Sequence, residues 1–530
     1  MLRLSSYAIL SERLPGGGYA LLNGCTGAVD TISDALAAIL KDAISRSECN
    51  PHPHHPSKQR YRHDVRVPTE RIPEAVVAHL LDQGQLTRAS HEVERAHVAR
   101  VADLMHEVAE LTPHFLIVPN LDCNYRCTYC FERPMQIKLK SPAAEISYAR
   151  GNVVMRPEHV DLVFRAIEQV RDAVRTRAMW KDLQAAGRLD PDAPVGSLIT
   201  LYGGEPLDAK NKDLVFRIVE EGVARGFRFA AITNGHDLEH FLPVLGEDRI
   251  SQIQISLDGP KRLHDRSRLA RNRESSFDKI VQNVNLALAQ GGVEVQLRCH
   301  IDPKNNDAFG ELMAEFRAQG WLDHPDVVIY ATNYHVKDKD GRVTQGIDYE
   351  DVLRLWNGAT ARHDNVHVSG VAVHADRALA PSLEVGGPAR LKGTYCGANA
   401  GLYIFAADGH VYSCWESVGK ECSRIGHFTT EAGLVLDERM AEKWFKRSVA
   451  KIPECLDCAY ALVCGGGCAQ YAEYNTGSLD KPYCDQFEVV FPAALADTVA
   501  GRRDGGNSRS QGADASAGAA PVVAQPALTT

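Results

Sequence analysis

The feature that most constrains this chain is a group of three closely spaced cysteines, Cys123, Cys127 and Cys130, in the pattern C-x3-C-x2-C. They directly follow the apolar run 115–118, which predicts that they lie at the end of a buried strand. Thiolates packed this closely are metal ligands more often than disulfide partners in a reducing compartment. Three ligands are too few for a structural zinc site, but they fit a [4Fe–4S] cluster with one iron left without a protein ligand.

The composition is that of an ordinary globular protein and argues against two classes of partner. The chain has 530 residues, of which 44% are hydrophobic and 24% charged, with a formal net charge of −9. Nucleic-acid binding usually shows as a basic excess, so we expect no nucleic-acid partner. No run of 18 apolar residues occurs, and residues 1–6 lack the design of a secretion signal, so we expect a cytoplasmic protein with no membrane partner. Its 14 cysteines should then be reduced and available to metals.

A repeated strand–loop–helix pattern covers residues 111–335. It predicts an α/β fold in which six β/α units wind a parallel sheet into a partial barrel, with the chemistry at the carboxyl ends of the strands. The cysteine motif follows the first of these strands. The expected strands are 115–121, 197–203, 227–233, 250–257, 293–301 and 327–332, and the expected helices are 157–174, 213–225, 236–245, 277–290 and 308–319.

Two of these strands carry polar side chains on one face and aliphatic side chains on the other. The aliphatic face of a barrel strand packs against helices, so the polar face should point into the barrel, where a packed core would instead hold branched aliphatics. The pattern indicates a barrel that holds a polar ligand, although two half-exposed antiparallel strands would alternate in the same way. The polar positions are Gln252, Gln254 and Ser256 on one strand, and Glu294, Gln296, Arg298 and His300 on the next.

Further candidate ligand-binding residues stand at the strand ends. Gly203 and Gly204 allow a backbone to approach a ligand closely, and Glu205 adds a carboxylate before Pro206. The complete set of candidates is Gly203, Gly204, Glu205, Pro206, Asn234, Ser256, Asp258 and Arg298.

In their order along the chain these elements resemble the radical SAM superfamily, over about residues 115–490. The resemblance implies a [4Fe–4S] cluster on the three cysteines, with S-adenosylmethionine (SAM) on its open iron. It also implies reductive cleavage of SAM to a 5′-deoxyadenosyl radical that abstracts hydrogen from a substrate, with a flavodoxin- or ferredoxin-type reductant as partner. Glu205 and its neighbours would meet the methionyl amino group, Ser256 the ribose, and Arg298 the SAM carboxylate.

A second field of eight cysteines lies between Cys396 and Cys484. Its Cx2Cx5Cx3C core by itself is compatible with zinc sites, a redox dithiol or iron–sulfur clusters. Together with a preceding CxnGx4C element it resembles the SPASM domain that follows many radical SAM barrels, expected here over 396–490. This resemblance implies two auxiliary [4Fe–4S] clusters. One would use Cys455, Cys458, Cys464 and Cys484, and the other Cys396, Cys414 and Cys468, with Cys422 or the substrate in its fourth position.

The rest of the chain is less specific. Residues 1–110 predict a separate α+β module, with a hairpin of 7–10 and 19–22 followed by helices. It is compatible either with a winged-helix-like module that resembles PqqD and captures leader peptides by strand addition, or with a lid that binds nothing. We interpret the polar stretch 46–64 as a solvated loop rather than a metal site, and expect 336–395 to be a bridge and 491–530 a disordered tail. The stretch 46–64 carries Cys49, His52, His54, His55 and His63.

The resemblance implies a maturase that abstracts hydrogen from a residue of a ribosomally made precursor peptide or protein, giving a thioether or carbon–carbon crosslink or another oxidation. One alternative is an anaerobic sulfatase-maturing enzyme that makes formylglycine. Another is a non-catalytic iron–sulfur protein for electron transfer or assembly. Sulfatase maturases carry an aspartate, the proposed base, directly after the Gx4C cysteine, where this chain has Trp415 and then Glu416. Glu416 is therefore the candidate catalytic residue.

Overall fold

The protein is described from a computed structural model. The structure describes residues 2–48, 50–51, 60–61, 63–130, 132, 153–190, 192, 194–302, 304–333, 335–337, 342–345, 363, 365–368, 375, 378–379, 383, 386–484 and 487–503. In this part of the chain, no helix is long and apolar enough to cross a membrane.

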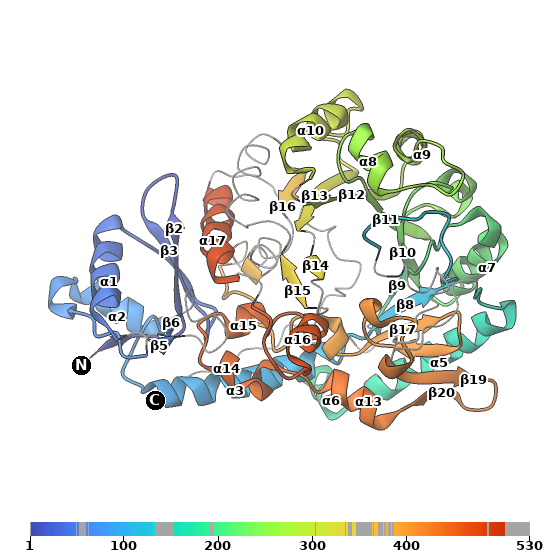
Figure 1. Ribbon diagram of the computed structural model, residues 1–530. Coiled ribbons are helices and arrows are strands. Elements are labelled where there is room, and N and C mark those ends of the chain that lie inside the picture. Colours follow the sequence, from blue (N-terminus) through green and yellow to red (C-terminus); the bar gives the residue numbers. More distant parts are fainter. Residues whose placement is uncertain are drawn as a thin grey trace.

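Six parallel strands in sequence order form the centre of the structure, and helices cover their outer side (Figure 1). The predicted α/β partial barrel is confirmed. The strands are β8 (His114–Val118), β9 (Leu198–Leu201), β10 (Arg228–Thr233), β11 (Ile250–Ser256), β12 (Glu294–Ile301) and β13 (Val327–Asn333), with β16 (Val366–Val368) beyond β13. The helices include α5 (Pro157–Thr176), α7 (Lys212–Val223), α9 (Ser276–Gln290) and α10 (Phe309–Ala318).

The core lies between the sheet and these helices because both present aliphatic stripes there. Ile253 and Ile255 of β11 are fully buried and share one cluster with Ile280 and Val284 of α9. The polar residues that alternate with them therefore face the other side of the sheet, into the barrel, as the pattern predicts.

The expected helix over 236–245 is wrong. The segment instead forms two short 3₁₀ turns, η3 (Leu238–His240) and η4 (Leu242–Val244). Pro243 has no backbone N–H to donate, so it cannot continue a helical ladder at this point. Two helices were not expected, α6 (Ala178–Ala185) and α8 (Lys261–Ser267).

The cysteine-rich region continues the barrel sheet rather than forming a detached unit. Strand β17 (Leu402–Ala406) pairs in parallel with β8, and β18 (His410–Tyr412), β19 (Arg424–Thr429) and β20 (Gly433–Leu436) follow as antiparallel strands. The result is an 11-stranded sheet. The helices of this region are α13 (Glu438–Phe445), α14 (Pro453–Leu456), α15 (Ala461–Cys464) and α16 (Ala469–Thr476), and a small hairpin pairs β14 (His335–Lys337) with β15 (Val343–Gln345).

The N-terminal part is an α+β unit built on a three-stranded antiparallel sheet. The expected hairpin is β2 (Ala8–Arg13) with β3 (Tyr19–Asn23), and β4 (Val29–Ile32) adds a third strand. The other elements are α1 (Asp34–Arg46), α2 (Glu74–Asp82), α3 (His91–Ala109), and the short pairs β1 (Arg3–Leu4) with β7 (Leu86–Thr87) and β5 (Asn50–Pro51) with β6 (Arg60–Tyr61).

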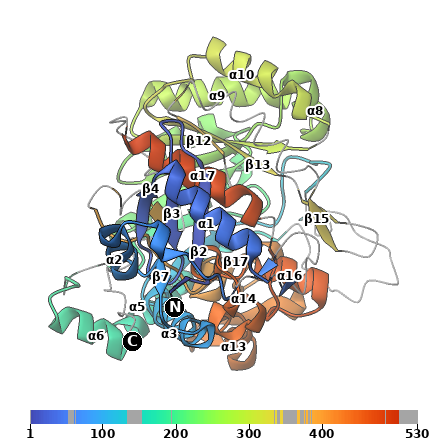
Figure 2. The same cartoon turned by 90° about the vertical axis from the view of Figure 1, so that its left-hand side faces the viewer.

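The boundary expected for the C-terminal tail needs correction. Helix α17 (Phe487–Arg503) crosses the proposed start of the tail at 491 and packs against β2 of the N-terminal sheet, as Figure 2 shows. Its buried Phe491 and Leu495 belong to the same core as Ile9 and Leu22. Composition suggested a tail because the following residues are rich in Gly and Ser. However, the segment up to residue 499 still carries enough apolar side chains to form a buried helix face. Residues 504–530 lie outside the described residues.

Candidate functional site

The three cysteines of the first motif gather in one buried pocket after β8. Cys123, Cys127 and Cys130 cluster with Tyr125 and Ala270. Burial, followed by the neighbouring acidic groups and thiols, raises the pKa of Cys123 and Cys130, the latter to about 12. Thiols in this environment ionise when a positively charged centre binds them, which suits an iron cluster.

The Gly203–Pro206 element contacts the backbone of the cysteine loop. A Cβ on Gly204 would lie 1.9 Å from the carbonyl oxygen of Asp122, the residue before Cys123. The Glu205 N–H donates to that same oxygen at 2.8 Å, and the side chain of Asn120 donates to the Glu205 carbonyl at 2.7 Å. Only glycine allows this close approach of the two backbones, so the element positions the cluster ligands.

The Glu205 carboxylate has protein partners on both oxygens. Oε1 accepts from the Leu207 N–H at 2.9 Å and from the Thr233 hydroxyl, and Oε2 accepts from the Asn234 N–H at 2.7 Å. Burial raises the pKa of Glu205 to about 7, against the lowering effect of these bonds. Glu205 therefore joins the ends of β9 and β10.

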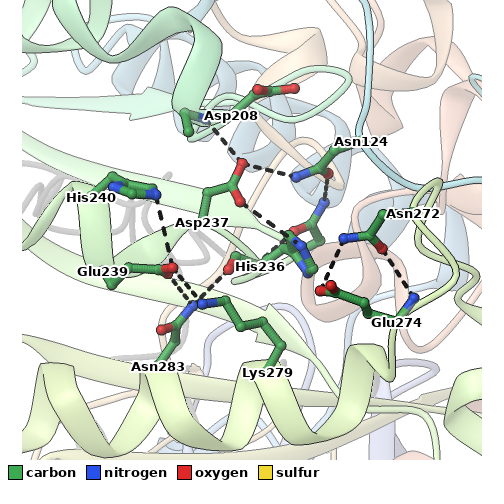
Figure 3. Close-up of polar contacts among 12 residues, drawn as sticks. Asn124, Asp208, His236, Asp237, Glu239, His240, Asn272, Glu274, Lys279 and Asn283 are labelled. Atoms are coloured by element: carbon green, nitrogen blue, oxygen red, sulfur yellow. Dashed lines mark hydrogen bonds and ion pairs between the residues drawn. The ribbon is translucent and has the colours of Figure 1, made fainter.

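Asn234, at the end of β10, reaches the cysteine loop directly. Its Nδ2 donates to the Asn124 side chain at 2.6 Å and lies 3.8 Å from the Cys123 sulfur. Figure 3 shows the next part of the network, in which Asn124 donates to Asp237 at 3.2 Å. On the far side, Asn283 of α9 donates to Glu239 at 2.7 Å (Figure 3). The predicted site residue thus belongs to a polar network that connects the cysteine loop with α9.

Asp258 is the centre of a second network, which sequence analysis did not foresee. His300 donates to its Oδ1 from the backbone at 3.1 Å and lies 3.0 Å away through Nδ1. Arg268 lies 3.6 Å from Oδ2, to which the Tyr129 hydroxyl also donates. Burial opposes ionisation, but His300 and Arg268 outweigh it and hold the pKa of Asp258 well below its usual range. The ionised Asp258 carboxylate therefore connects β11, β12 and the cysteine loop through its polar contacts.

Arg298 and Ser256 lie opposite each other on neighbouring strands. They are register partners on β12 and β11, and Arg298 contacts the Nε2 of His300. This pairing places Ser256, the predicted contact to the SAM ribose, and Arg298, the predicted contact to the SAM carboxylate, at the same level of the barrel. Sequence analysis did not single out Asn124, Tyr129 and Arg268, whereas the alternation of polar residues along β12 had already placed His300 on the face toward the barrel interior.

The barrel interior offers unused polar groups of the kind a polar ligand needs. Buried atoms without a hydrogen-bond partner include Gln252 Oε1, Gln254 Nε2, Arg298 Nε and Thr332 Oγ1. Leaving such groups unpaired costs about 1–3 kcal/mol each. They come from three adjacent strands, and their donors and acceptors fit the amino-acid and nucleoside parts of SAM.

Two groups of neighbouring cysteines lie in the second cysteine field. One cavity is lined by Cys455, Cys458, Cys464 and Cys484. The thiols of Cys455, Cys458 and Cys464 interact electrostatically with the thiol of Cys484. Burial and these thiols raise the pKa of Cys484 above its ordinary range. A cavity walled by four thiols fits a four-ligand [4Fe–4S] cluster.

The other group consists of Cys396, Cys414 and Cys468. Burial raises the pKa of Cys414, and the thiols of Cys468 and Cys396 raise it further. Cys422 is exposed, and its sulfur lies 3.9 Å from the hydroxyl of its neighbour Ser423. The three thiols fit a second cluster, and its fourth position stays a prediction.

The spacing of the cysteines favours iron–sulfur clusters over single zinc ions. Four thiolates around one zinc ion lie about 3.8 Å apart, given a Zn–S distance near 2.3 Å. Among the described residues, the one group of three ligand atoms found within 4.8 Å of one another contains no cysteine; it is His63, His91 and Asp457. Among the described cysteines, no three sulfur atoms lie that close to one another.

The His63 group is a junction of polar side chains. The His63 and His91 rings stack with their centroids 3.6 Å apart. The Asp457 Oδ1 lies 3.0 Å from His91 Nε2 and accepts from Arg95 Nε at 2.9 Å, so its charge is already balanced. Cys49, His52, His54 and His55 lie outside the described residues. The junction attaches α3 to the loop between Cys455 and Cys458.

Comparison with known proteins now decides the family of the barrel. Residues 117–316 match the radical SAM superfamily. This chain contains a radical SAM domain. The radical SAM superfamily uses a [4Fe–4S] cluster and SAM, and the match of residues 117–316 confirms both predicted cofactors.

Three further known proteins are similar to this chain. It is 22% identical over 267 residues to a cysteine-type anaerobic sulfatase-maturating enzyme of Clostridium novyi, which covers 49% of this chain and 69% of that protein. The fold is similar to anSMEcpe, solved with AdoMet and the Cp18Cys peptide, with a TM-score of 0.51 and 16% identity over 74% of this chain and 98% of that one. Streptococcus suis SuiB bound to its precursor peptide SuiA matches with a TM-score of 0.45 and 13% identity, over 92% of this chain and 99% of SuiB.

Glu416 lies on the auxiliary side of the radical SAM barrel, held by two tyrosines and a lysine. The Tyr471 and Tyr474 hydroxyls donate to its two oxygens at 3.3 and 3.4 Å, and Lys337 Nζ lies 3.8 Å from Oε2. Lys420 donates to the Tyr474 hydroxyl, and burial, together with nearby Lys337, lowers the pKa of Lys420. The cluster combines acidic, phenolic and basic groups within hydrogen-bonding reach.

Trp415 connects the two ends of the site. Its ring lies 5.9 Å from that of Tyr202, which directly precedes Gly203, and its backbone directly follows Cys414. The side chain is 41% exposed although it is large and apolar. A large apolar side chain that is exposed next to Cys414 and Tyr202 is suited to contact a binding partner.

Proposed function

We propose that this chain is a maturase that modifies a residue of a ribosomally made peptide or protein. When both are bound, the first cluster and SAM supply reductive cleavage to a 5′-deoxyadenosyl radical. The observation that carries the proposal is the position of Trp415 and Glu416 next to Cys414, a predicted auxiliary ligand, with the Trp415 ring against Tyr202, the residue before the predicted SAM-binding Gly203. A substrate side chain there would contact groups from both sites.

In this proposal Glu416 acts as the base. Its carboxylate accepts hydrogen bonds from Tyr471 and Tyr474, which orient it, and Lys337 stabilises its charged form. A proton taken from the substrate would then have a path to solvent along Tyr474 and Lys420, which are in direct contact.

The second candidate is formylglycine formation in a sulfatase. Similarity to the Clostridium novyi sulfatase-maturating enzyme supports it as well as it supports a general peptide maturase. The chain differs by having Trp415 at the position where an aspartate is expected, so Glu416, one residue further on, would have to serve as the base.

We also propose that residues 1–110 bind the leader of a precursor. Strand β4 lies at one end of the order β2-β3-β4 and pairs with β3 alone among the described strands. An added peptide strand would find free backbone donors and acceptors at that edge.

The test begins with the full-length chain, reconstituted anaerobically with iron and sulfide and given SAM and a strong reductant. We expect 5′-deoxyadenosine, and its absence would support a non-catalytic iron–sulfur protein instead. The triple Cys123/Cys127/Cys130→Ala variant should abolish 5′-deoxyadenosine. The Cys455→Ala variant should retain some SAM cleavage but form no modified peptide; equal loss of both would contradict a separate auxiliary role.

A second experiment separates the two candidate substrates. Two substrates are compared by mass spectrometry. One is a sulfatase peptide that contains the Cys or Ser to be modified, and the other is the precursor peptide whose gene lies nearest to the gene of this chain. Modification of only the sulfatase peptide would favour the second candidate. With the true substrate, Glu416→Gln should reduce the yield of modified peptide about 100-fold or more while leaving SAM cleavage in place.

A further inference from the structure

A buried arginine lies between the two auxiliary cysteine groups. Arg447 follows α13 and is 1% exposed. Its guanidinium donates to the carbonyl oxygens of Gly467, Gly466 and Lys481, at 3.1, 3.0 and 3.0 Å, and its Nε donates to the carbonyl of Leu479. These four bonds use four of the five N–H donors of the side chain, but none of them balances its charge.

The ionisable side chains that act on Arg447 include cysteines of both groups. The thiols of Cys455 and Cys464, from one group, interact electrostatically with the Arg447 guanidinium. The thiols of Cys396 and Cys468, from the other group, do so as well. In the described part of the chain, Arg447 forms no ion pair with a carboxylate. A buried cation without a counter-charge costs several kcal/mol, so this position requires negative charge nearby. Thiolate-ligated clusters supply that charge.

The loop that Arg447 binds also belongs to both groups. Gly465, Gly466 and Gly467 connect Cys464, a ligand of one predicted cluster, with Cys468, a ligand of the other. All three glycines have φ between 70° and 84°, so their carbonyls point in directions that other residues rarely adopt. Two of those carbonyls point to the guanidinium, which therefore lies where the two ligand sets meet.

We propose that Arg447 is a shared electrostatic positioning residue that stabilises the reduced state of both auxiliary clusters. One-electron reduction adds a negative charge to a cluster, and a fixed cation in a medium of low dielectric constant favours that change. Because the same cation lies near both cysteine groups, it raises the reduction potentials of both clusters. The inference rests on the proposed auxiliary clusters and adds to them a role for a residue that is not a ligand.

The experiment is a redox titration of the reconstituted full-length protein, followed by electron paramagnetic resonance. In Arg447→Gln, which keeps hydrogen-bond donors but loses the charge, we expect the equilibrium constant for reduction of each auxiliary cluster to fall about tenfold, or 59 mV for a one-electron couple. Arg447→Lys keeps the charge and should stay within about threefold of the wild type. The SAM-binding cluster should keep its potential in both variants and serves as the internal reference.

Arg424 provides the matched control because it is a partly buried arginine of the same region that pairs with Tyr412 and Asp408 rather than with cysteines. Arg424→Gln should leave the auxiliary potentials unchanged. Unchanged potentials in Arg447→Gln would overturn the proposal. Loss of auxiliary iron in both the Gln and Lys variants would also overturn it, since the role would then be structural. A wild-type protein that binds only the iron of one cluster would instead contradict the auxiliary clusters themselves.

Discussion

The Tyr129 hydroxyl donates a hydrogen bond to Oδ2 of Asp258, and this contact joins the loop of the first three cysteines to the end of β11. Tyr129 stands between Cys127 and Cys130 in the sequence, whereas Asp258 belongs to the strand-end element that resembles the ribose-binding part of the family. Arg268 also bonds to the Tyr129 hydroxyl. Side-chain hydrogen bonds thus connect the loop of the three cysteines with the strand end that carries predicted SAM-binding residues.

Replacing Tyr129 with Phe should weaken SAM binding. The change removes a bond to a charged carboxylate, worth about 1.5–3 kcal/mol, and lets the cysteine loop move relative to β11. We expect the Kd for SAM to rise about tenfold or more in equilibrium dialysis with reconstituted protein. Tyr412→Phe is the matched control, since it removes a similar tyrosine–aspartate bond, to Asp408, at 2.8 Å in β18. Equal SAM affinity in the Tyr129 and Tyr412 variants would contradict the prediction.

Stability should depend on pH through His264. Burial, followed by Arg268, lowers the pKa of this histidine to about 4, so it is neutral in the folded protein. In the unfolded chain its pKa is about 6.5, so unfolding takes up a proton between pH 4 and 6.5 and stability falls as the pH drops through that window. At pH 5.5 the loss amounts to about 1.4 kcal/mol relative to pH 8.

The measurement compares thermal unfolding at pH 7.5 and 5.5 for the wild type and His264→Gln. The variant should show a smaller drop in Tm over this range, even if it is less stable at both pH values. His427→Gln removes an exposed histidine and should reproduce the wild-type drop. A wild-type drop retained in full by the His264 variant would refute this assignment.

Gly204→Ala should displace the first cysteine loop. The new Cβ would overlap the Asp122 carbonyl oxygen at 1.9 Å, and it would also lie 2.5 Å from the Asp122 carbonyl carbon and 2.8 Å from that of Leu121, which are backbone atoms. We expect a loss of about 1–3 kcal/mol of stability and a lower iron content. Gly310→Ala is the control because its Cβ would meet no atom within 4 Å, and alanine in α10 should be neutral or stabilising. Iron analysis and thermal melts of both variants provide the test, and full iron content in Gly204→Ala would show that the loop tolerates the shift.

Cys414 and Cys422 should differ in their effect on iron content. Cys414 is buried beside Cys468 and Cys396, whereas Cys422 is exposed. Cys414→Ser should remove about one cluster of iron, and Cys422→Ser should retain the full complement. An equal loss from both variants would identify Cys422 as the fourth ligand.

The sequence alone determined the fold class and the chemistry of the first cluster. Strands β8 to β13 were predictable because each is a short apolar or alternating run bounded by turn residues, and such local patterns need no tertiary information. The three clustered cysteines likewise carry their chemistry in their spacing. The His236–Leu245 segment was not predictable as two 3₁₀ turns, because its apolar spacing imitates a helix until Pro243 and the packing of Phe241 against the sheet decide otherwise.

Only the tertiary structure decided which distant segments of the chain lie in contact with one another. It paired β17 with β8, which makes the cysteine-rich region an extension of the barrel sheet, and it placed α17 against the N-terminal strands. It also gave Asp258 its partners Tyr129 and His300, and brought Arg447 between two sets of cysteines. These contacts join residues far apart in the chain, and the free energy of burying their charges depends on neighbours that no local pattern specifies.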